Sequence, residues 1–312
     1  MPAYDAFLLV SFGGPEGPDD VMPFLENVTR GRNVPRARLE AVAEHYLAFG
    51  GVSPINEQCR ELIAALDLPV PVYWGNRNWT PYLTDTVQAM TAAGVRRALA
   101  FVTSAYRSYS SCRQYLEDIE RARAATGPAA PVIDKIQRFY DHPGFTGPFA
   151  VALAEVPPDA HVVFTAHSIP LAMAELAGPG GDRYVAELTT ACRLITEQAG
   201  VHRPWSLAYT SRSGPPSQPW LEPDINDHMA VLAKEGVRAV AVVPVGFVSD
   251  HMEVRHDLDV EAAATAQSLG LVFTRVATPG VRLAPMIERL VRQHMAGDAP
   301  EPCPAGCCLR LA

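Results

Sequence analysis

The sequence lacks any run of about 20 consecutive apolar residues, which is the length that a membrane-spanning helix requires. Its first residues also lack a basic segment ahead of a long apolar stretch, so no secretory signal is indicated. Charged residues are sparse, at 19% of 312, and they leave a net charge of -8. Because nucleic-acid-binding proteins normally carry a basic patch or stripe, this balance argues against that class. We expect a cytosolic protein.

Two common nucleotide-binding fingerprints are also missing. Glycine pairs stand at Gly13-Gly14 and Gly50-Gly51, but neither pair has the spacing of a phosphate-binding P-loop or of the dinucleotide motif GxGxxG. Cysteine is rare, yet three of the six cysteines, Cys303, Cys307 and Cys308, lie in the last ten residues. In a reducing compartment such a cluster indicates a metal site more than disulfides.

The chain does contain a regular alternation of short apolar runs and amphipathic stretches. The runs are bounded by turn residues, as buried parallel strands are. They cover residues 7–11, 70–74, 98–103, 132–138, 161–165, 206–210, 239–244 and 271–276. Helical patterns cover residues 19–28, 36–49, 81–93, 110–124, 183–198, 224–234, 253–268 and 284–294. Strand–helix alternation predicts parallel sheets covered by helices on both faces.

The two halves of the chain resemble each other. Ahead of an apolar run in each half, Pro81, Asp85 and Gly94 recur as Pro223, Asp227 and Gly236. We therefore predict two similar Rossmann-like α/β lobes, residues 1–143 and 144–296, and a cysteine-rich tail, residues 297–312; generic α/β patterning is the alternative. Since ligands of open α/β sheets bind beyond the carboxyl ends of the strands, a flat ligand would lie in a cleft between the lobes.

His167 stands just past one of the predicted strands, where a side chain would face this cleft. Neutral imidazole can act as a base or as a metal ligand near neutral pH. A histidine tied to the backbone near a turn is the alternative. Phe12 occupies the matching strand end in the first half and would form the opposite, aromatic wall.

An acidic row follows the strand at residues 239–244. Asp250, Glu253, Asp257 and Glu261 have the spacing of one helical face, with His251 among them. Helix capping explains the first acids but not the continuation of the row. Oxygen and imidazole ligands suit ferrous iron, and carboxylates can relay protons. A solvated helix face is the alternative.

The corresponding segment of the first half carries aromatic and basic residues instead. Tyr106 and Arg107 can stack on a ring and bind its carboxylates. A further loop, after Tyr46, combines two glycines with the hydrogen-bonding residues Ser53 and Asn56. Taken singly, each segment is consistent with an ordinary surface loop.

Together these segments resemble the ferrochelatases, from residue 8 to about residue 294. The most specific are Thr165-Ala166-His167-Ser168-Ile169-Pro170 and Ser249-Asp250-His251 followed by Glu253. The resemblance implies a two-lobed chelatase fold with ferrous iron and a porphyrin as substrates. It assigns His167 and Glu253 to metal handling and proton removal, with Asp250, His251 and Asp257 assisting. It also implies Ser53 and Tyr115 as porphyrin contacts.

Finer features are similar to one branch of this family. The segments Asn76-Arg77-Asn78-Trp79 and Ser211-Arg212-Ser213-Gly214 resemble the actinobacterial branch, which implies coproporphyrin III as the porphyrin. Phe12 replaces a tyrosine that can ligate the product iron in related enzymes, so iron ligation from that wall is not expected.

The tail is similar to that of members holding a [2Fe–2S] cluster, which requires four thiolates. The resemblance points to Cys112 as the fourth ligand beside the three tail cysteines, since Cys59 and Cys192 have the pattern of buried hydrophobic residues. Adventitious zinc or an unstructured end are the alternatives for the tail.

We therefore predict a monomeric, cytoplasmic enzyme of haem biosynthesis that inserts ferrous iron into coproporphyrin III, with transient contacts to neighbouring enzymes of the pathway. The expected porphyrin contacts are Phe12, Tyr46, Ser53, Asn56, Tyr106, Arg107 and Tyr115. Protoporphyrin IX as substrate, cobalt as the metal, a non-catalytic haem or metal carrier and an iron–sulfur redox protein remain the alternatives.

Overall fold

The computed structural model describes residues 4–200, 202–214, 217–304 and 306–310. The outermost residues of the predicted first lobe and of the predicted tail lie outside the described residues, as does residue 305 within the tail. None of the helices in these ranges is both long enough and apolar enough to span a membrane.

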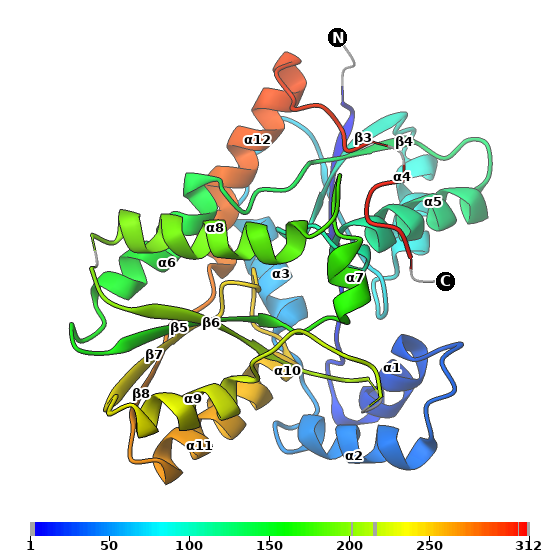
Figure 1. Ribbon diagram of the computed structural model, residues 1–312. Coiled ribbons are helices and arrows are strands. Elements are labelled where there is room, and N and C mark those ends of the chain that lie inside the picture. The colour runs from blue at the N-terminus through cyan, green and yellow to red at the C-terminus, as the bar shows by residue number, and fades with distance from the viewer. Residues whose placement is uncertain (1–3, 201, 215–216, 305, 311–312) are drawn as a thin grey trace.

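Two four-stranded parallel sheets form the centre of the structure (Figure 1). The first has the order β2-β1-β3-β4, with β1 at Ala6–Ser11, β2 at Val72–Asn76, β3 at Arg97–Val102 and β4 at Val132–Lys135. The second has the order β6-β5-β7-β8, with β5 at His161–His167, β6 at Trp205–Thr210, β7 at Ala239–Val243 and β8 at Val272–Arg275. The equal strand orders confirm the prediction of two similar parallel lobes.

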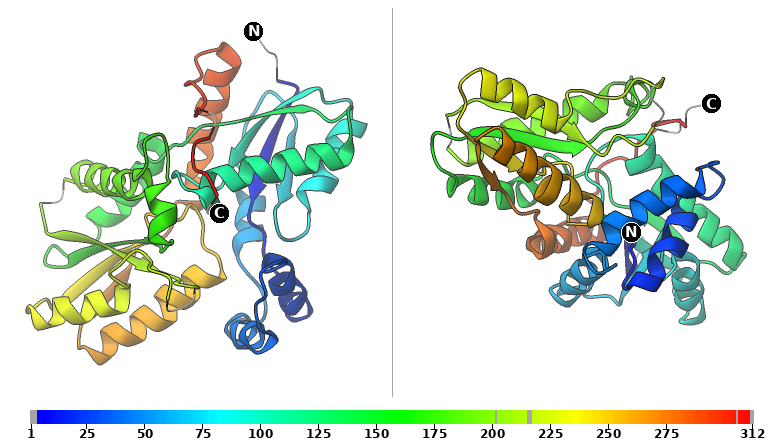
Figure 2. Two further views of the ribbon diagram at one scale, coloured as in Figure 1. Left: turned by 45° about the vertical axis from the view of Figure 1, so that its right-hand side comes forward. Right: turned by 90° about the horizontal axis from the view of Figure 1, so that it is seen from below.

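Helices flank the sheets of both lobes (Figure 2). The first lobe contains α1 (Val21–Val28), α2 (Arg36–Leu47), α3 (Ile55–Ala64), α4 (Leu83–Ala92) and α5 (Gln114–Thr126). The second contains α6 (Pro143–Ala154), α7 (Leu171–Glu175), α8 (Arg183–Gln198), α9 (Ile225–Lys234), α10 (Met252–Val254), α11 (Ala263–Ser268) and α12 (Ala284–Ala296). Short 3₁₀ turns precede α1 and α12, at η1 (Pro18–Asp20) and η4 (Gly280–Leu283).

Three of these helices, α3, α6 and α7, were not predicted from the sequence. The first two residues of α3, Ile55 and Asn56, were treated as the end of the glycine-containing loop, and no helix was assigned to the residues after them. The apolar residues of α6 are spread around the helix rather than gathered on one side, and Pro148 lies inside it, so it lacks the period that marks an amphipathic helix.

Both lobes carry a π-helix after their third strand. In the first lobe η2 (Tyr109–Arg113) leads into α5, and in the second η3 (Arg255–Ala262) lies between α10 and α11. The single α-helix predicted at residues 253–268 was therefore wrong in its interior. A π-helix is closed by i→i+5 hydrogen bonds and frequently marks a functional site.

The lobes share one continuous apolar core. A chain of rings runs from Phe101 on β3 through Phe139 and Phe145 to Phe149 on α6, with successive centroid distances of 4.8, 5.5 and 5.6 Å. Helix α6 begins beside the predicted join between the lobes. Burial of these aromatic side chains fixes one lobe against the other.

Candidate active site

His167 and Glu253 lie close together, although 85 residues separate them in the chain. His167 is the last residue of β5, and Glu253 lies in α10, after the end of β7. The Nε2 atom of His167 is 3.9 Å from Oε2 of Glu253, and the two side chains are 37% and 51% exposed. The pair is therefore open to a solute.

The hydrogen bond of the His167 ring decides which nitrogen faces the glutamate. Nδ1 is bonded to the backbone carbonyl of Ser168. Because a carbonyl oxygen only accepts, Nδ1 carries the proton in this bond. Neutral His167 consequently presents the lone pair of Nε2 toward Glu253. The Tyr184 hydroxyl donates to the carbonyl of His167 at 2.9 Å and fixes the end of the strand.

Close backbone packing brings the Glu253 segment to this strand end. The Gly246 N–H donates to the Thr165 carbonyl at 3.0 Å. A Cβ atom at Gly246 would lie 2.6 Å from Cα of Ala166, so only glycine allows this approach. The segment after β7 therefore packs directly against the strand that ends in His167.

Asp257 lies one turn beyond Glu253 on the π-helix. The Ser211 hydroxyl donates to its Oδ2. Burial raises the pKa of Asp257 to about 6, and the charges of Glu253 and Glu261 act in the same direction. A carboxyl with a pKa near 6 can both hold and release a proton close to neutral pH.

The π-helix brings His256 and Glu261 to the same side. His256 Nδ1 is 3.7 Å from Asp257 Oδ1 and 3.8 Å from Glu261 Oε1. The ligand atoms of these three residues all lie within 4.8 Å of one another. Across the lobe boundary, the ring of His45 on α2 stacks on His256, with centroids 3.8 Å apart. The acidic row thus continues from Glu253 to a histidine-containing group.

These partners show what sequence reasoning missed. Ser211 and His256 stood in segments that were singled out, but no role was given to either. The spacing of five between His256 and Glu261 indicates contact only when the helix is known to be a π-helix. Nothing in the sequence marks His45 as their neighbour.

Asp250 and His251 differ in their surroundings. Asp250 Oδ1 accepts hydrogen bonds from Arg275 at 2.6 Å and from Thr278 at 3.1 Å, so its charge is compensated inside the second lobe. Burial lowers the pKa of His251, which favours the neutral ring; the Glu253 charge opposes this shift and that of His167 adds to it. His251 therefore interacts electrostatically with Glu253 and His167. Asp250 instead fixes the loop before α10 through its bonds to Arg275 and Thr278.

Of the residues predicted to contact a porphyrin, Phe12 is exposed and the others are buried. Asn56 donates to the Gly14 carbonyl at 3.2 Å, and a Cβ atom at Gly14 would lie 2.6 Å from that of Ser53. These two residues thus support the loop after β1. Tyr115 lies under the guanidinium of Arg77, 4.4 Å from its ring centroid.

Tyr46 is also buried, but it lies next to the acidic row. Burial raises the pKa of its hydroxyl, and the charges of Glu253 and Asp257 raise it further. It packs in one apolar cluster with Met252, the residue before Glu253.

Tyr106 and Arg107 hold the lobes together. The Tyr106 hydroxyl donates to the carbonyl of Val245 at 2.8 Å. Arg107 forms a buried ion pair with Glu187 of α8, whose Oε2 also accepts the Arg107 N–H at 2.8 Å. Both side chains thus have partners across the lobe boundary in this structure, and their assignment as porphyrin contacts stays a prediction.

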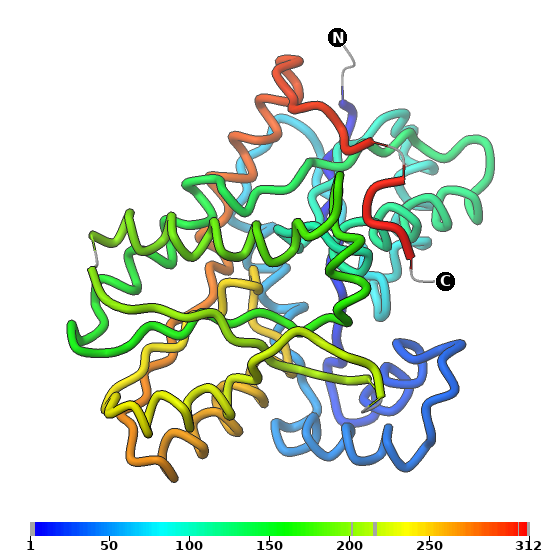
Figure 3. The backbone as a smooth tube through the Cα atoms, viewed as in Figure 1, coloured from blue at the N-terminus to red at the C-terminus, as the bar shows by residue number. Residues whose placement is uncertain are grey.

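The cysteine tail returns from α12 to the first lobe (Figure 3). Sγ of Cys307 lies 3.4 Å from Sγ of Cys308, and the Gly178 N–H donates to Cys308 at 3.2 Å. The hydrogen bond between Cys112 and Cys308 lowers the pKa of Cys112 and raises that of Cys308; burial raises both, and Lys135 and Arg107 lower that of Cys112. Cys303 interacts with Cys307 and with Arg107. Four thiols thus gather beside two cations, whereas Cys59 and Cys192 are buried elsewhere.

Known proteins resemble this chain over nearly its whole length. A structure described as SirB from Bacillus subtilis with Fe3+ superposes with a TM-score of 0.58 at 14% identity, covering 94% of this chain and 96% of the other. The SirB sirohydrochlorin chelatase from Bacillus subtilis subspecies spizizenii in complex with cobalt gives a TM-score of 0.55, also at 14% identity, over 94% and 95% of the two chains. At this identity the likeness shows a shared fold.

Relatives with closer sequences carry one name, coproporphyrin III ferrochelatase. That of Frankia alni is 53% identical over 98% of this chain and 87% of its own length. That of Nocardia farcinica is 51% identical over 98% and 97%, and that of Mycolicibacterium smegmatis 50% identical over 97% and 95%. The family model described as Ferrochelatase matches residues 4–295. The chain belongs to the ferrochelatase family.

Proposed function

We propose that this enzyme inserts ferrous iron into coproporphyrin III in haem biosynthesis. The observation that carries the proposal is the approach of His167 Nε2 to Glu253 Oε2, at 3.9 Å, in a solvent-open position. The names of the actinobacterial relatives support coproporphyrin III as the porphyrin. The cytoplasmic location, the monomeric state and transient contacts with neighbouring enzymes stay predictions from the sequence.

The pair offers one ion two ligand atoms of different kinds. Metal–ligand bonds of roughly 2.0–2.2 Å allow two ligand atoms up to about 4 Å apart to share an ion. Imidazole nitrogen and carboxylate oxygen both suit ferrous iron. The pair can therefore replace part of the water around the ion before it reaches the porphyrin.

Insertion requires that two pyrrole N–H protons leave as Fe²⁺ takes their place, so charge is conserved. His167 accepts one proton at Nε2, and the carboxylate of Glu253 accepts the other. Each is a base at the position where a proton is released. Phe12, exposed on the first lobe, provides an apolar face for the ring but no ligand atom for iron.

The acidic row supplies a route for cations and protons toward the pair. It runs from the group of His256 and Glu261 past Asp257 to Glu253. Asp257 is the member whose proton equilibrium lies near neutral pH. We expect it to pass protons from the pair to solvent.

Asp257→Asn is expected to remove the rise of the iron-insertion rate near pH 6. Below about pH 6 the carboxyl of Asp257 holds its proton and can neither accept another nor attract a cation. The wild-type insertion rate should therefore rise as pH passes through 6, and the variant should lack this limb. Rates measured between pH 5 and 8 with both proteins test this, and an unchanged limb in the variant would count against the role.

The same shift has a consequence for stability. A carboxyl whose folded pKa exceeds its unfolded value weakens the fold as pH rises from about 4 to about 6. Asp257→Asn should therefore be more stable than wild type at pH 7, by roughly 1–3 kcal/mol. Thermal unfolding at pH 4 and pH 7 provides the measurement; a gain of equal size at both values would contradict the assignment.

The experiment that tests the function compares substrates side by side. Purified protein is supplied with Fe²⁺ or Co²⁺ and with coproporphyrin III or protoporphyrin IX, and product is counted per enzyme molecule. Many turnovers with iron and coproporphyrin III are expected. A single turnover would favour a carrier, and a preference for cobalt or for protoporphyrin IX would replace the proposed substrate.

We further propose that Cys112, Cys303, Cys307 and Cys308 would hold a [2Fe–2S] cluster. The support is the chemistry of the donors: the four thiols interact in pairs, and Arg107 and Lys135 lie near enough to compensate the negative charge that thiolates bring. Metal binding requires deprotonated thiols, which nearby cations favour. When bound, such a cluster supplies one-electron redox chemistry. The residues that would hold it belong to η2 of the first lobe and to the tail, which rests on Gly178 of the second lobe.

A further inference from the structure

The segment around Glu253 belongs to the second lobe but packs against the first. Met252, the residue before it, is buried in a cluster formed by α1 and α2 of the first lobe. Arg255, two residues after it, lies over the ring of Phe49 with its guanidinium carbon 5.2 Å from the centroid. His167, by contrast, is held within the second lobe by Tyr184 and by pairing of β5 with β6. The separation of the pair therefore depends on how this segment is attached to the first lobe.

Gln58 of α3 makes that attachment at the entry of α10. Its Oε1 accepts the backbone N–H of Asp250 at 2.9 Å. Asp250 stands immediately before His251, the N-cap of α10, so this N–H belongs to the turn that presents Glu253. The side chain of the same Asp250 is bound by Arg275 and Thr278 of the second lobe. One residue is thus fixed by its backbone from one lobe and by its side chain from the other.

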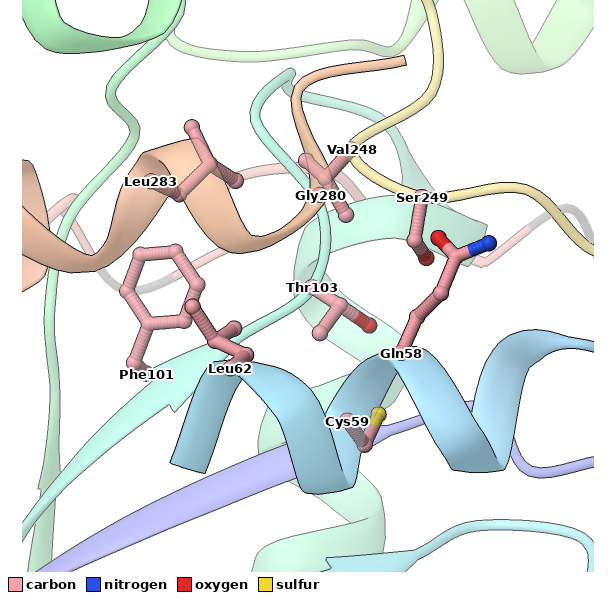
Figure 4. A pocket seen from close by; sticks show the side chains of 9 residues that line it. All are labelled: Gln58, Cys59, Leu62, Phe101, Thr103, Val248, Ser249, Gly280 and Leu283. Carbon is pink, nitrogen blue, oxygen red and sulfur yellow. The ribbon is translucent and has the colours of Figure 1, made fainter. Parts of the chain in front are cut away.

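The surroundings of Gln58 leave little room for adjustment. A cavity of only about 10 Å³, close to the space of one water molecule, lies between Gln58 and Thr103 of the first lobe and Val248 and Ser249 of the second (Figure 4). Figure 4 shows the amide of Gln58 directed toward Ser249. The Gly280 N–H also donates to the Val248 carbonyl at 2.8 Å. Among the described residues Gln58 Oε1 is the acceptor bonded to the Asp250 N–H, so a loss of this bond would leave that N–H without its protein partner.

We propose that Gln58 is a positioning residue for Glu253: by binding the Asp250 N–H across the lobe boundary it sets the distance between the Glu253 carboxylate and His167. The inference rests on the proposed iron insertion for its catalytic consequence. The hydrogen bond itself is independent of that function. A displacement of about 1 Å in such a pair can lower a rate up to about 100-fold.

Gln58→Met and Gln58→Glu test this role. Methionine keeps the length of the side chain and removes the acceptor, whereas glutamate keeps an acceptor oxygen. Gln58→Met is expected to lower kcat for iron insertion about tenfold with the KM for porphyrin unchanged within twofold. Gln58→Glu should recover kcat to within about threefold of wild type.

Gln198→Met is the matched control, since Gln198 also accepts a side-chain hydrogen bond, from Thr146 at 2.9 Å, in the second lobe on α8. Hydrogen exchange supplies a readout that needs no activity. Amides of residues 249–256 should exchange faster in Gln58→Met and at the wild-type rate in Gln58→Glu and Gln198→Met.

The outcomes separate the two proposals. Equal losses of kcat in Gln58→Met and Gln198→Met, or no recovery in Gln58→Glu, would overturn the positioning role. Unchanged exchange of residues 249–256 in Gln58→Met would overturn it as well. If wild-type protein inserts no iron, the proposed function fails, and the exchange experiment alone then decides whether Gln58 holds the turn.

Discussion

Replacing His167 with alanine is expected to lower iron insertion by about 10²–10⁴-fold, the usual contribution of a positioned base. The variant loses the Nε2 lone pair that faces Glu253 across 3.9 Å, and with it both an iron ligand and a proton acceptor. Porphyrin binding should stay within about twofold, because the imidazole contributes to metal handling. Initial rates with Fe²⁺ and quenching of porphyrin fluorescence measure the two effects separately.

His202→Ala is the control for this variant. His202 is exposed and precedes β6, which runs parallel to β5. It therefore lies near the amino ends of these strands, whereas His167 lies at the carboxyl end of β5. Its replacement should change neither rate nor binding. An insertion rate of His167→Ala close to that of His202→Ala would refute the assignment of the pair, and with it the proposed route of iron.

Replacing Cys112 with serine is expected to remove the iron–sulfur site completely. In the proposed cluster site Cys112 is the one thiol from the body of the protein, while the other three come from the tail. A cluster of this type requires four thiolates, and serine offers a hydroxyl whose proton is not lost near neutral pH. Purified wild-type protein should show visible absorption and bound iron and sulfide, and Cys112→Ser should show neither.

Cys192→Ala provides the control, because Cys192 is fully buried in α8, apart from the four clustered thiols. It should keep the absorption of wild type. If the proposed cluster is bound, Cys112→Ser should also unfold at a lower temperature than wild type, since the variant would lack the connection that the cluster makes between the tail and the first lobe. Colourless wild-type protein prepared without oxygen would contradict the cluster, and so would a coloured Cys112→Ser variant.

The substitutions of Gln58 and Asp257 are expected to change the insertion rate less than that of His167. The four tests address different features: the pair of His167 and Glu253, the acidic row, the hydrogen bond of Gln58 between the lobes, and the cysteine tail. His167 and Cys112 lie in different regions. The changes in unfolding free energy caused by the two single substitutions should therefore nearly add in the double variant.

Local sequence determined the repeating architecture of this protein. Buried strands need apolar residues on both faces, so β5 and β7 stand out as short continuous runs between turn residues. The helix of residues 183–198 has one apolar side and was located to the residue. The position of His167 at a strand end followed from the same pattern. These features depend on neighbours in the chain, which is why they can be read without coordinates.

Only the tertiary structure decided which polar side chains face the site. Tyr106 and Arg107 have residue types suited to a porphyrin, yet both turn into the lobe boundary, because partners at Val245 and Glu187 are available there. Gln58 and His45 meet residues about 200 positions away, through packing of one lobe on the other. Such contacts depend on the relative placement of two lobes, and no periodicity within either lobe encodes it.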